Sequence, residues 1–122
     1  MAASSLASQS NIICHLPSGQ VELCMMQFLR GYCILRAEPV VASINALDEA
    51  PRTAFLKDMV RVGDAIMQIT GAYRINYGVF GNSDPVLHAH IVPRYLTEPD
   101  AYRHGYSALY SDPVLFLIPY SS

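Results

Sequence analysis

Short apolar runs separated by turn residues fill the first third of the chain. They cover residues 11–16, 21–28 and 32–35. Residues 17–20 read Pro-Ser-Gly-Gln, which is typical of a turn that closes a hairpin. Residues 36–39 read Arg-Ala-Glu-Pro, and the proline ends the third run. The pattern predicts three successive strands with short connections, which form an antiparallel meander.

The periodicity changes after Asp48. Apolar residues then recur at intervals of three, four and seven, which indicates one stripe of a helix: Phe55, Leu56, Met59, Val60, Ile66 and Met67. Asp48 is a suitable N-cap, and Gly71 stands where a helix commonly ends. The sequence therefore predicts a helix over residues 48–70. We expect its other face to carry the charged side chains of Arg52, Lys57, Asp58, Arg61 and Asp64.

The strand pattern returns after the helix. Residues 74–80 read Arg-Ile-Asn-Tyr-Gly-Val-Phe, residues 81–85 read Gly-Asn-Ser-Asp-Pro, and the strand that carries two histidines continues to residue 94. A loop of this length between adjacent strands fits antiparallel pairing. The helix lies between two groups of strands, which predicts an α+β fold with the helix covering one face of the sheet. Gly63 in the helical stripe either permits close approach to the sheet or weakens the helix.

Two of the four histidines lie in the last of these runs. His88 and His90 are two residues apart, so on a strand both imidazoles point to one face, about 6 to 7 Å apart. Leu87, Ala89 and Ile91 would point to the opposite face and enter the core. Both rings can therefore reach one small anion or one metal ion, although a His-x-His pair also occurs on half-exposed strands with no such role.

The segment around these histidines resembles the signature of the histidine triad (HIT) family of nucleotidyl hydrolases and transferases. In that signature three histidines alternate with apolar residues on one strand, and a Pro-Arg exit often follows. Residues 86–94 read Val-Leu-His-Ala-His-Ile-Val-Pro-Arg, so the last two histidines are kept and Val86 stands where the first belongs. Residues 76–77 and 81–83 are similar to the family's lead-in to this strand.

The resemblance implies a fold and an assembly. We expect an α+β, HIT-like antiparallel β-sheet meander with one long helix packed on it, in a single domain of residues 11–122 that follows a flexible N-terminal tail of residues 1–10. A homodimer is also implied, in which the helix and one strand pair across a twofold axis and the sheet spans both copies. The apolar residues 114–118 would pack on the core, on the partner subunit or over the site.

Composition narrows the possible partners. The chain has 122 residues, 52% of them hydrophobic, which suits one compact domain whose pocket a dimer would enlarge. A net charge of −2, with eight scattered lysines and arginines, offers no basic stripe for a nucleic acid. Cys14, Cys24 and Cys33 are spaced for neither a disulfide framework nor a zinc knuckle, so we expect reduced thiols. Residues 1–10 lack the basic and apolar regions of a signal peptide, so we expect a cytoplasmic protein with no membrane contact.

Imidazole chemistry suggests what the histidine pair can do. A neutral imidazole can attack phosphorus and later leave from it, provided that one ring nitrogen donates to a fixed acceptor and the other keeps its lone pair. A second imidazole beside it, if protonated, can neutralise a non-bridging phosphate oxygen as charge builds up. Ser83, Asn82 and the backbone N–H groups of residues 81–83 are suitable to hold the remaining oxygens.

The resemblance assigns roles to individual residues. It implies that His88 is the nucleophile, which forms a covalent nucleotidyl-histidine (phosphohistidine) intermediate, and that His90 is a phosphate ligand. Ser83 matches a position that contacts phosphate or the leaving group. Val86 departs from the pattern, but its backbone carbonyl can still orient the nucleophile. Arg36 stands near a position that contacts the nucleotide in many members, where it would bind phosphate or remain a surface residue.

Three functions remain open. The first is a nucleotide-binding hydrolase or transferase that acts on the α-phosphate of a nucleoside phosphoramidate or dinucleoside polyphosphate, with no cofactor. The second is a nucleotide-binding protein of the same fold that has lost catalysis. The third is a small metal-binding protein that uses the histidine pair and a further ligand such as Asp84 or His104. We expect Arg94 to be a structural arginine at a strand exit and His15 to have no role in the site, while His104 stays open.

Overall fold

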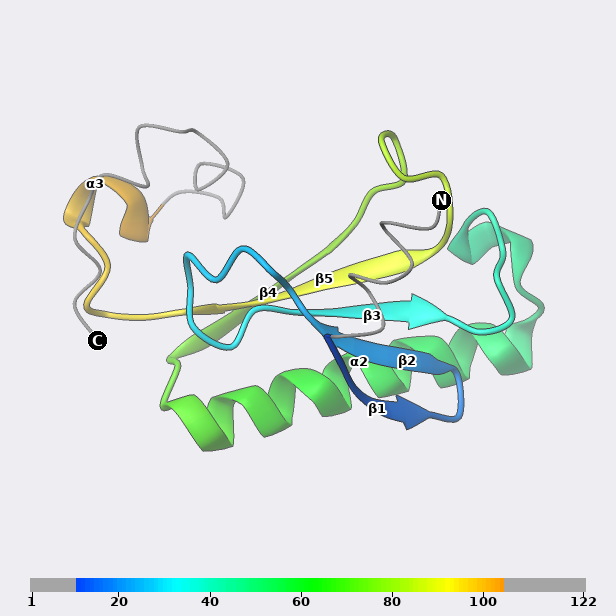
Figure 1. Ribbon diagram of the computed structural model, residues 1–122, viewed down its shortest axis with the longest axis horizontal. Coiled ribbons are helices and arrows are strands. Elements are labelled where there is room, and N and C mark those ends of the chain that lie inside the picture. The colour runs from blue at the N-terminus through cyan, green and yellow to red at the C-terminus, as the bar shows by residue number, and fades with distance from the viewer. Residues whose placement is uncertain (1–10, 105–122) are drawn as a thin grey trace.

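The computed structural model describes residues 11–104, which form one antiparallel sheet and one long helix (Figure 1). The elements are β1 (Ile12–Leu16), β2 (Gly19–Leu23), β3 (Cys33–Ala37), the short 3-10 helix η1 (Ile44–Ala46), α2 (Glu49–Thr70), β4 (Arg74–Val79), β5 (His88–Arg94) and α3 (Asp100–Arg103). The five strands are ordered β1-β2-β3-β5-β4, and every neighbouring pair is antiparallel. The predicted α+β class is confirmed. The N-terminal residues 1–10, the apolar residues 114–118 and the end of the predicted domain lie outside the described residues.

The β1–β2 hairpin turns at residues 17–18, as its turn residues predict. Gly19 opens β2 beside β3, where a Cβ would collide with the carbonyl of Arg36. The third strand extends beyond its predicted end at residue 35, because Arg36 and Ala37 continue to pair with β2. Arg36 therefore lies within the sheet.

The predicted second strand, residues 21–28, is wrong beyond Leu23. The chain turns away there and closes a loop, in which the N–H of Cys24 donates to the carbonyl of Tyr32 at 3.0 Å. The Gln27 side chain holds this loop, because its Nε2 donates to the carbonyls of Cys24 and Tyr32 at 2.6 and 2.8 Å. Its Oε1 accepts a backbone N–H at 2.9 Å. The predicted strand was too long because the apolar pattern of a sequence gives no information on these side-chain hydrogen bonds.

The long helix α2 begins and ends where the cap residues predict. Asp48 occupies the N-cap, although only its carbonyl bonds to the helix, accepting from the N–H of Arg52 at 2.9 Å. Gly71 is left-handed, with a φ of 75°, and its N–H donates to the carbonyl of Met67 at 3.0 Å. No helix in residues 11–104 combines the length and apolar character that crossing a membrane requires.

The face of α2 that meets the sheet differs from the predicted stripe. Its buried residues are Phe55, Asp58, Val62, Gly63 and Ile66. The prediction that Leu56, Val60 and Met67 enter the core is wrong, because they are 41%, 45% and 38% exposed. The sheet covers only part of the broad apolar surface of the helix, and these three side chains lie on its flank.

Asp58 is the second correction on this helix. It was expected on the charged outer face, yet only 3% of it is exposed. Its Oδ2 accepts hydrogen bonds from the backbone N–H and the hydroxyl of Ser18, at 3.0 and 2.7 Å. The turn between β1 and β2 reaches the helix here and needs an acceptor for these donors, so Asp58 joins the hairpin to α2.

Gly63 permits a close contact between α2 and β4. A Cβ at this position would collide with the hydroxyl of Tyr77, which lies across the helix. Of the two expectations for this glycine, close approach to the sheet is therefore the one observed. Leu56, Val60 and Met67 are seven, three and four positions from Gly63, so they share its side of the helix, and the exposed flank of α2 is on the side of β4.

Two apolar clusters lie on opposite faces of the sheet. The larger lies between α2 and the sheet and includes Leu87, Ala89 and Ile91, so the prediction that these residues enter the core is confirmed. The smaller includes Val92, which alternates onto the same face of β5 as the histidines, together with Leu29 from the loop after β2. The histidine face is thus open to solvent only in part.

The connection between β4 and β5 is longer than predicted, because β4 ends at Val79 and β5 begins at His88 rather than at residue 86. Leu87 at its end is already bound to the chain around β3. Its N–H donates to the carbonyl of Val41 at 2.8 Å, and its carbonyl accepts from the N–H of Ala37 at 3.1 Å. These hydrogen bonds fix the position of the chain segment directly before His88.

Candidate functional site

The histidine pair lies inside the sheet, on the face that α2 leaves open. On one side of β5, Arg36 of β3 stands opposite His88 and Ile34 stands opposite His90. On the other side Gly78 of β4 stands opposite His90. The imidazole centroids are 4.9 Å apart, with an angle of 70° between the rings. Both rings therefore lie on one face, as their spacing in the sequence predicts.

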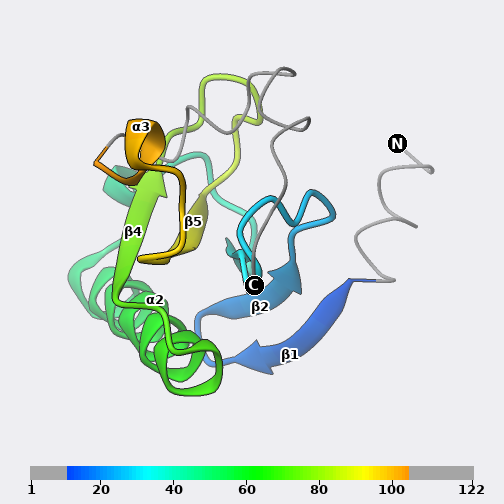
Figure 2. The same cartoon turned by 90° about the vertical axis from the view of Figure 1, so that its left-hand side faces the viewer.

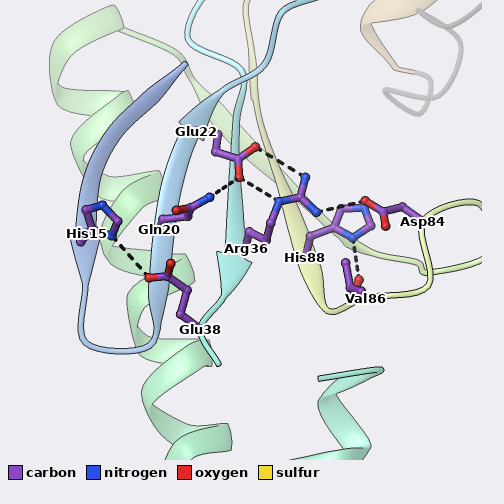
Figure 3. A network of polar contacts seen from close by, with 8 residues as sticks. All are labelled: His15, Gln20, Glu22, Arg36, Glu38, Asp84, Val86 and His88. Carbon is purple, nitrogen blue, oxygen red and sulfur yellow. Dashed lines mark hydrogen bonds and ion pairs between the residues drawn. The ribbon is translucent and has the colours of Figure 1, made fainter. Parts of the chain in front are cut away.

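His88 has one ring nitrogen fixed by the backbone. Its Nδ1 is 2.8 Å from the carbonyl oxygen of Val86, as Figure 3 shows. A carbonyl can only accept, so in the neutral ring Nδ1 carries the proton and donates it, and Nε2 keeps its lone pair. His88 is only 6% exposed. The neutral ring therefore has the single unprotonated nitrogen that an imidazole nucleophile requires.

His90 has a different kind of partner. Its Nδ1 is hydrogen-bonded to the phenol of Tyr32 at 2.7 Å. The ring lies between two aromatic rings, with centroids 5.9 Å from Tyr32 and 6.0 Å from Phe80. Burial, then the charges of His88 and Arg36, lower the pKa of His90 below its ordinary value. These surroundings disfavour protonation of the second imidazole, which was the condition for it to neutralise a phosphate oxygen.

Phe80 takes its place at the site because Gly78 has no side chain. A Cβ at Gly78 would collide with the ring of Phe80, which therefore folds back over β4 beside His90. The ring is nevertheless 72% exposed. It forms an apolar wall that a flat ligand can stack against.

Arg36 is held by two carboxylates next to His88 (Figure 3). Its Nε donates to Glu22 at 2.8 Å and its Nη1 to Asp84 at 3.0 Å. Gln20 donates to the same Glu22 at 2.8 Å. Although burial lowers the pKa of Arg36, its hydrogen bonds to Glu22 and Asp84 outweigh that effect and raise it. Of the two expectations for Arg36, the simple surface residue does not fit a guanidinium with two partners.

The loop before β5 carries the remaining site residues from the sequence. Asn82 and Ser83 are exposed on it, after Gly81 with its positive φ of 106°. Asp84 ties this loop to the sheet through Arg36. Within residues 11–104 neither Asn82 nor Ser83 contacts the histidines through a hydrogen bond, so their part in binding stays a prediction.

The other histidines and Arg94 lie outside this cluster. His15 is bonded to Glu38 at 3.3 Å, and the ring of His104 is 3.4 Å from the guanidinium of Arg103. Arg94 forms a buried ion pair at 2.8 Å with Glu98. Among the described residues no three histidines, cysteines or acids gather as metal ligands. Asp84, one of the two further ligands that the metal hypothesis offered, accepts a hydrogen bond from Arg36.

Solved structures of other proteins share this fold. No family model and no curated protein sequence matches the chain. A solved histidine triad protein from Bradyrhizobium japonicum has a TM-score of 0.62 and 21% identity, over 88% of this chain and 88% of that one. Another, from Sinorhizobium meliloti, has a TM-score of 0.65 and 24% identity, over 74% of this chain and 67% of that one. The chain has the histidine triad fold.

A third solved structure has the same fold. It is a HIT-like protein involved in cell-cycle regulation from Bartonella henselae, with a TM-score of 0.64 and 14% identity, over 78% of this chain and 79% of that one. At identities this low, the likeness to these structures shows the fold alone and not the function of the site.

Sequence reasoning missed three residues of this candidate site: Tyr32, Phe80 and Glu22. Tyr32 is separated from His90 by 58 positions, and nothing local to either residue links them. The signal that would have found Tyr32 is the pairing of β3 with β5, since residues 32, 34 and 36 alternate onto one face. That pairing could not be read from the sequence.

Proposed function

We propose that the protein is a member of the histidine triad family and a nucleotide-binding hydrolase or transferase. It acts on the α-phosphate of a nucleoside phosphoramidate or dinucleoside polyphosphate. The observation that carries the proposal is the bond of 2.8 Å from Nδ1–H of His88 to the carbonyl of Val86. It leaves Nε2 of His88 as a lone pair on the open face of the sheet. Valine supplies this carbonyl as well as any residue would.

His88 acts in two displacement steps. In the first, Nε2 forms a bond to the α-phosphorus while the bond to the leaving nitrogen or oxygen breaks, and the leaving group keeps the electron pair and takes up a proton. In the second, water attacks phosphorus, the bond to Nε2 breaks, its electron pair returns to the ring, and the attacking oxygen loses a proton. Hydrolysis thus consumes one water and releases a nucleoside monophosphate and the protonated leaving group. A transferase replaces the water with another nucleophile.

The groups around His88 suit a phosphate. Arg36 stands opposite it on β3 and has N–H groups that can donate to a phosphate oxygen, although the charges of Glu22 and Asp84 together exceed its own. His90 lies beside it as a phosphate ligand. Ser83 and Asn82 are exposed on the loop that Asp84 ties down, where their side chains and backbone N–H groups can donate to phosphate oxygens.

A nucleotide-binding protein without useful turnover is the second candidate. The observation that favours it is the low exposure of His88, 6%, which restricts the approach of a phosphorus atom to Nε2. The side chain of Val86 adds no hydrogen bond either. Both candidates require nucleotide binding, and only the first requires turnover that depends on His88.

We further propose that the protein is a cytoplasmic homodimer that binds a small molecule and neither nucleic acid nor membrane. The proposed interface follows the outer edge of β4, which no other strand of residues 11–104 covers. Exposed apolar side chains lie on β4, just before it, and on the adjoining flank of α2: Tyr73, Tyr77, Val79, Leu56, Val60 and Met67. Pairing of two β4 edges would continue the sheet from one copy into the other.

The test is turnover of an adenosine phosphoramidate and two dinucleoside polyphosphates, with AMP binding measured by calorimetry alongside. We expect His88→Asn to abolish turnover and to keep the Kd for AMP within about tenfold, or about 1.4 kcal/mol. His15→Asn is the matched control, because His15 is exposed and bonded to Glu38, and it should change neither quantity. Binding without turnover in the wild type would support the second candidate, and absence of both would contradict the two together.

A further inference from the structure

Tyr32 is held at its backbone, its ring and its phenol oxygen. It comes directly before β3, where its carbonyl accepts from Cys24 and from Gln27. Phe28 packs on its ring with centroids 6.0 Å apart. Its phenol oxygen is 2.7 Å from Nδ1 of His90. The phenol therefore meets this nitrogen as part of a built loop and not as a loose surface side chain.

The direction of the bond between Tyr32 and His90 follows from the acceptors available. The phenol has two polar neighbours, Nδ1 of His90 and the thiol of Cys24. A neutral imidazole nitrogen is a good acceptor, whereas a thiol sulfur accepts and donates only weakly. Burial raises the pKa of Tyr32 to about 12, so the phenol keeps its proton as a donor. The strong donor is best matched with the strong acceptor, and the O–H points to Nδ1.

We propose that Tyr32 is a positioning residue that holds His90 in the tautomer opposite to that of His88. With Nδ1 accepting from the phenol, the proton of neutral His90 is on Nε2. The carbonyl of Val86 leaves the proton of His88 on Nδ1. Two imidazoles with centroids 4.9 Å apart thus present complementary nitrogens, a lone pair on one and an N–H on the other.

Such a pair suits attack on a phosphate. The lone pair of His88 approaches phosphorus while the N–H of His90 donates to an oxygen that gains negative charge. His90 does this as a neutral ring, in keeping with surroundings that lower its pKa. Within residues 11–104 no other group bonds to Nε2 of His90, so this nitrogen is available to a ligand. The catalytic consequence rests on the proposed function, but the tautomer itself does not.

The tautomer is tested by heteronuclear NMR on isotopically labelled protein at mildly alkaline pH, where ring nitrogens with and without a proton have distinct shifts. We expect the proton on Nδ1 in His88 and on Nε2 in His90. In Tyr32→Phe the ring stays packed on Phe28 and only the donor is lost, so His90 should become a mixture of tautomers while His88 is unchanged. A wild-type His90 that carries its proton on Nδ1 would overturn the proposal, whatever the protein turns over.

Kinetics test the catalytic consequence with the substrate that turnover assays identify. We expect Tyr32→Phe to lower kcat about ten- to a hundredfold, as is usual for partners that orient a functional imidazole, with KM within about threefold. Tyr77→Phe is the matched control, because that hydroxyl lies against Gly63 on the α2 side of the sheet, and it should leave kcat unchanged. An unchanged kcat in Tyr32→Phe, with the tautomer shift seen by NMR, would refute the catalytic role and leave the proposed function standing.

Discussion

The backbone, and not a side chain, orients His88. The carbonyl of Val86 accepts from Nδ1 at 2.8 Å, and it belongs to a chain segment that is itself fixed by the hydrogen bonds of Leu87 to Val41 and Ala37. A substitution at residue 86 changes the side chain and keeps this carbonyl. The position can therefore vary without loss of the tautomer that the proposed nucleophilic attack requires.

Val86→Ala and Val86→His test this independence. We expect both variants to keep kcat within about threefold of the wild type, which is less than about 0.7 kcal/mol in the transition-state free energy. The measurement is steady-state turnover of the best substrate of the panel. A larger rise in Val86→His would mean that an imidazole at this position adds a hydrogen bond that valine lacks. A large loss in Val86→Ala would show that the carbonyl alone does not hold the ring.

His90 should make stability depend on pH. Its folded pKa lies below the unfolded value of about 6.5, because burial, His88 and Arg36 disfavour the charged ring. Between the two pKa values the unfolded chain binds a proton that the folded chain does not, so the free energy of unfolding falls as pH is lowered from about 6.5. Urea unfolding at a series of pH values should show this slope in the wild type and a smaller one in His90→Gln. Equal slopes would refute the assignment.

The histidine pair was predictable and its surroundings were not. His88 and His90 share a face because a strand alternates, which is a local property of the sequence. Tyr32, Glu22 and Asp84 reach the pair or its neighbour Arg36 only through the register of β2, β3 and β5 and the course of two loops. Apolar pattern and spacing carry no information on such register. The bond between Asp84 and Arg36 was not predicted for this reason.

The contact between α2 and the first hairpin depends on one buried carboxylate. Asp58 has 3% of its surface exposed and accepts two hydrogen bonds from Ser18, so a turn and a helix are joined by a single side chain. Arg61 adds a contact to Asp58 at 3.4 Å, but it is largely exposed and contributes little.

Asp58→Ala should therefore destabilise the fold. Loss of hydrogen bonds to a charged, buried acceptor costs about 2 to 3 kcal/mol in the free energy of unfolding. Asp64→Ala is the control on the same helix, because Asp64 is exposed, and it should stay within about 0.5 kcal/mol of the wild type. Both are measured by urea denaturation. Equal stabilities of the two variants would mean that the bonds to Ser18 do not stabilise the fold.

Element boundaries were predicted best where the signals are local. Asp48 and Gly71 mark the ends of α2 because capping depends on one or two residues at each end. Leu56 and Val60 were misplaced because helical periodicity does not say how wide a strip of the helix the sheet covers. The second strand was extended too far because Gln27 closes the following loop through side-chain bonds.

The sheet separates two apolar clusters of different size. The larger apolar cluster lies under α2, and the smaller one lies on the opposite face beneath the loop after β2. A buried ion pair between Arg94 and Glu98 fixes the end of β5 at the smaller cluster. Tyr32 packs against this smaller cluster and also bonds to His90. The second cluster therefore supports the site as well as the fold.

Exposed apolar side chains lie along one edge of the described structure, on β4 and α2. Figure 2 shows α2 and β4 side by side, with β1 at the opposite edge of the sheet. Leu56, Val60 and Met67 on α2 continue the exposed apolar side chains of β4 across Tyr77. A free strand edge beside an apolar helix flank can pair with its own copy, which would satisfy the backbone groups of β4 and bury the flank in one contact.

Val60→Lys tests this interface. Lysine is as compatible with a helix as valine, and Val60 is 45% exposed, so the variant should fold, while a buried charge at the contact would oppose association. We expect light scattering to give a dimer for the wild type and a monomer for Val60→Lys. The control is Ile13→Lys, since Ile13 is 55% exposed on β1 at the other edge, and this variant should remain a dimer. A monomeric wild type would contradict the homodimer, and a dimeric Val60→Lys would exclude this flank of α2 as its interface.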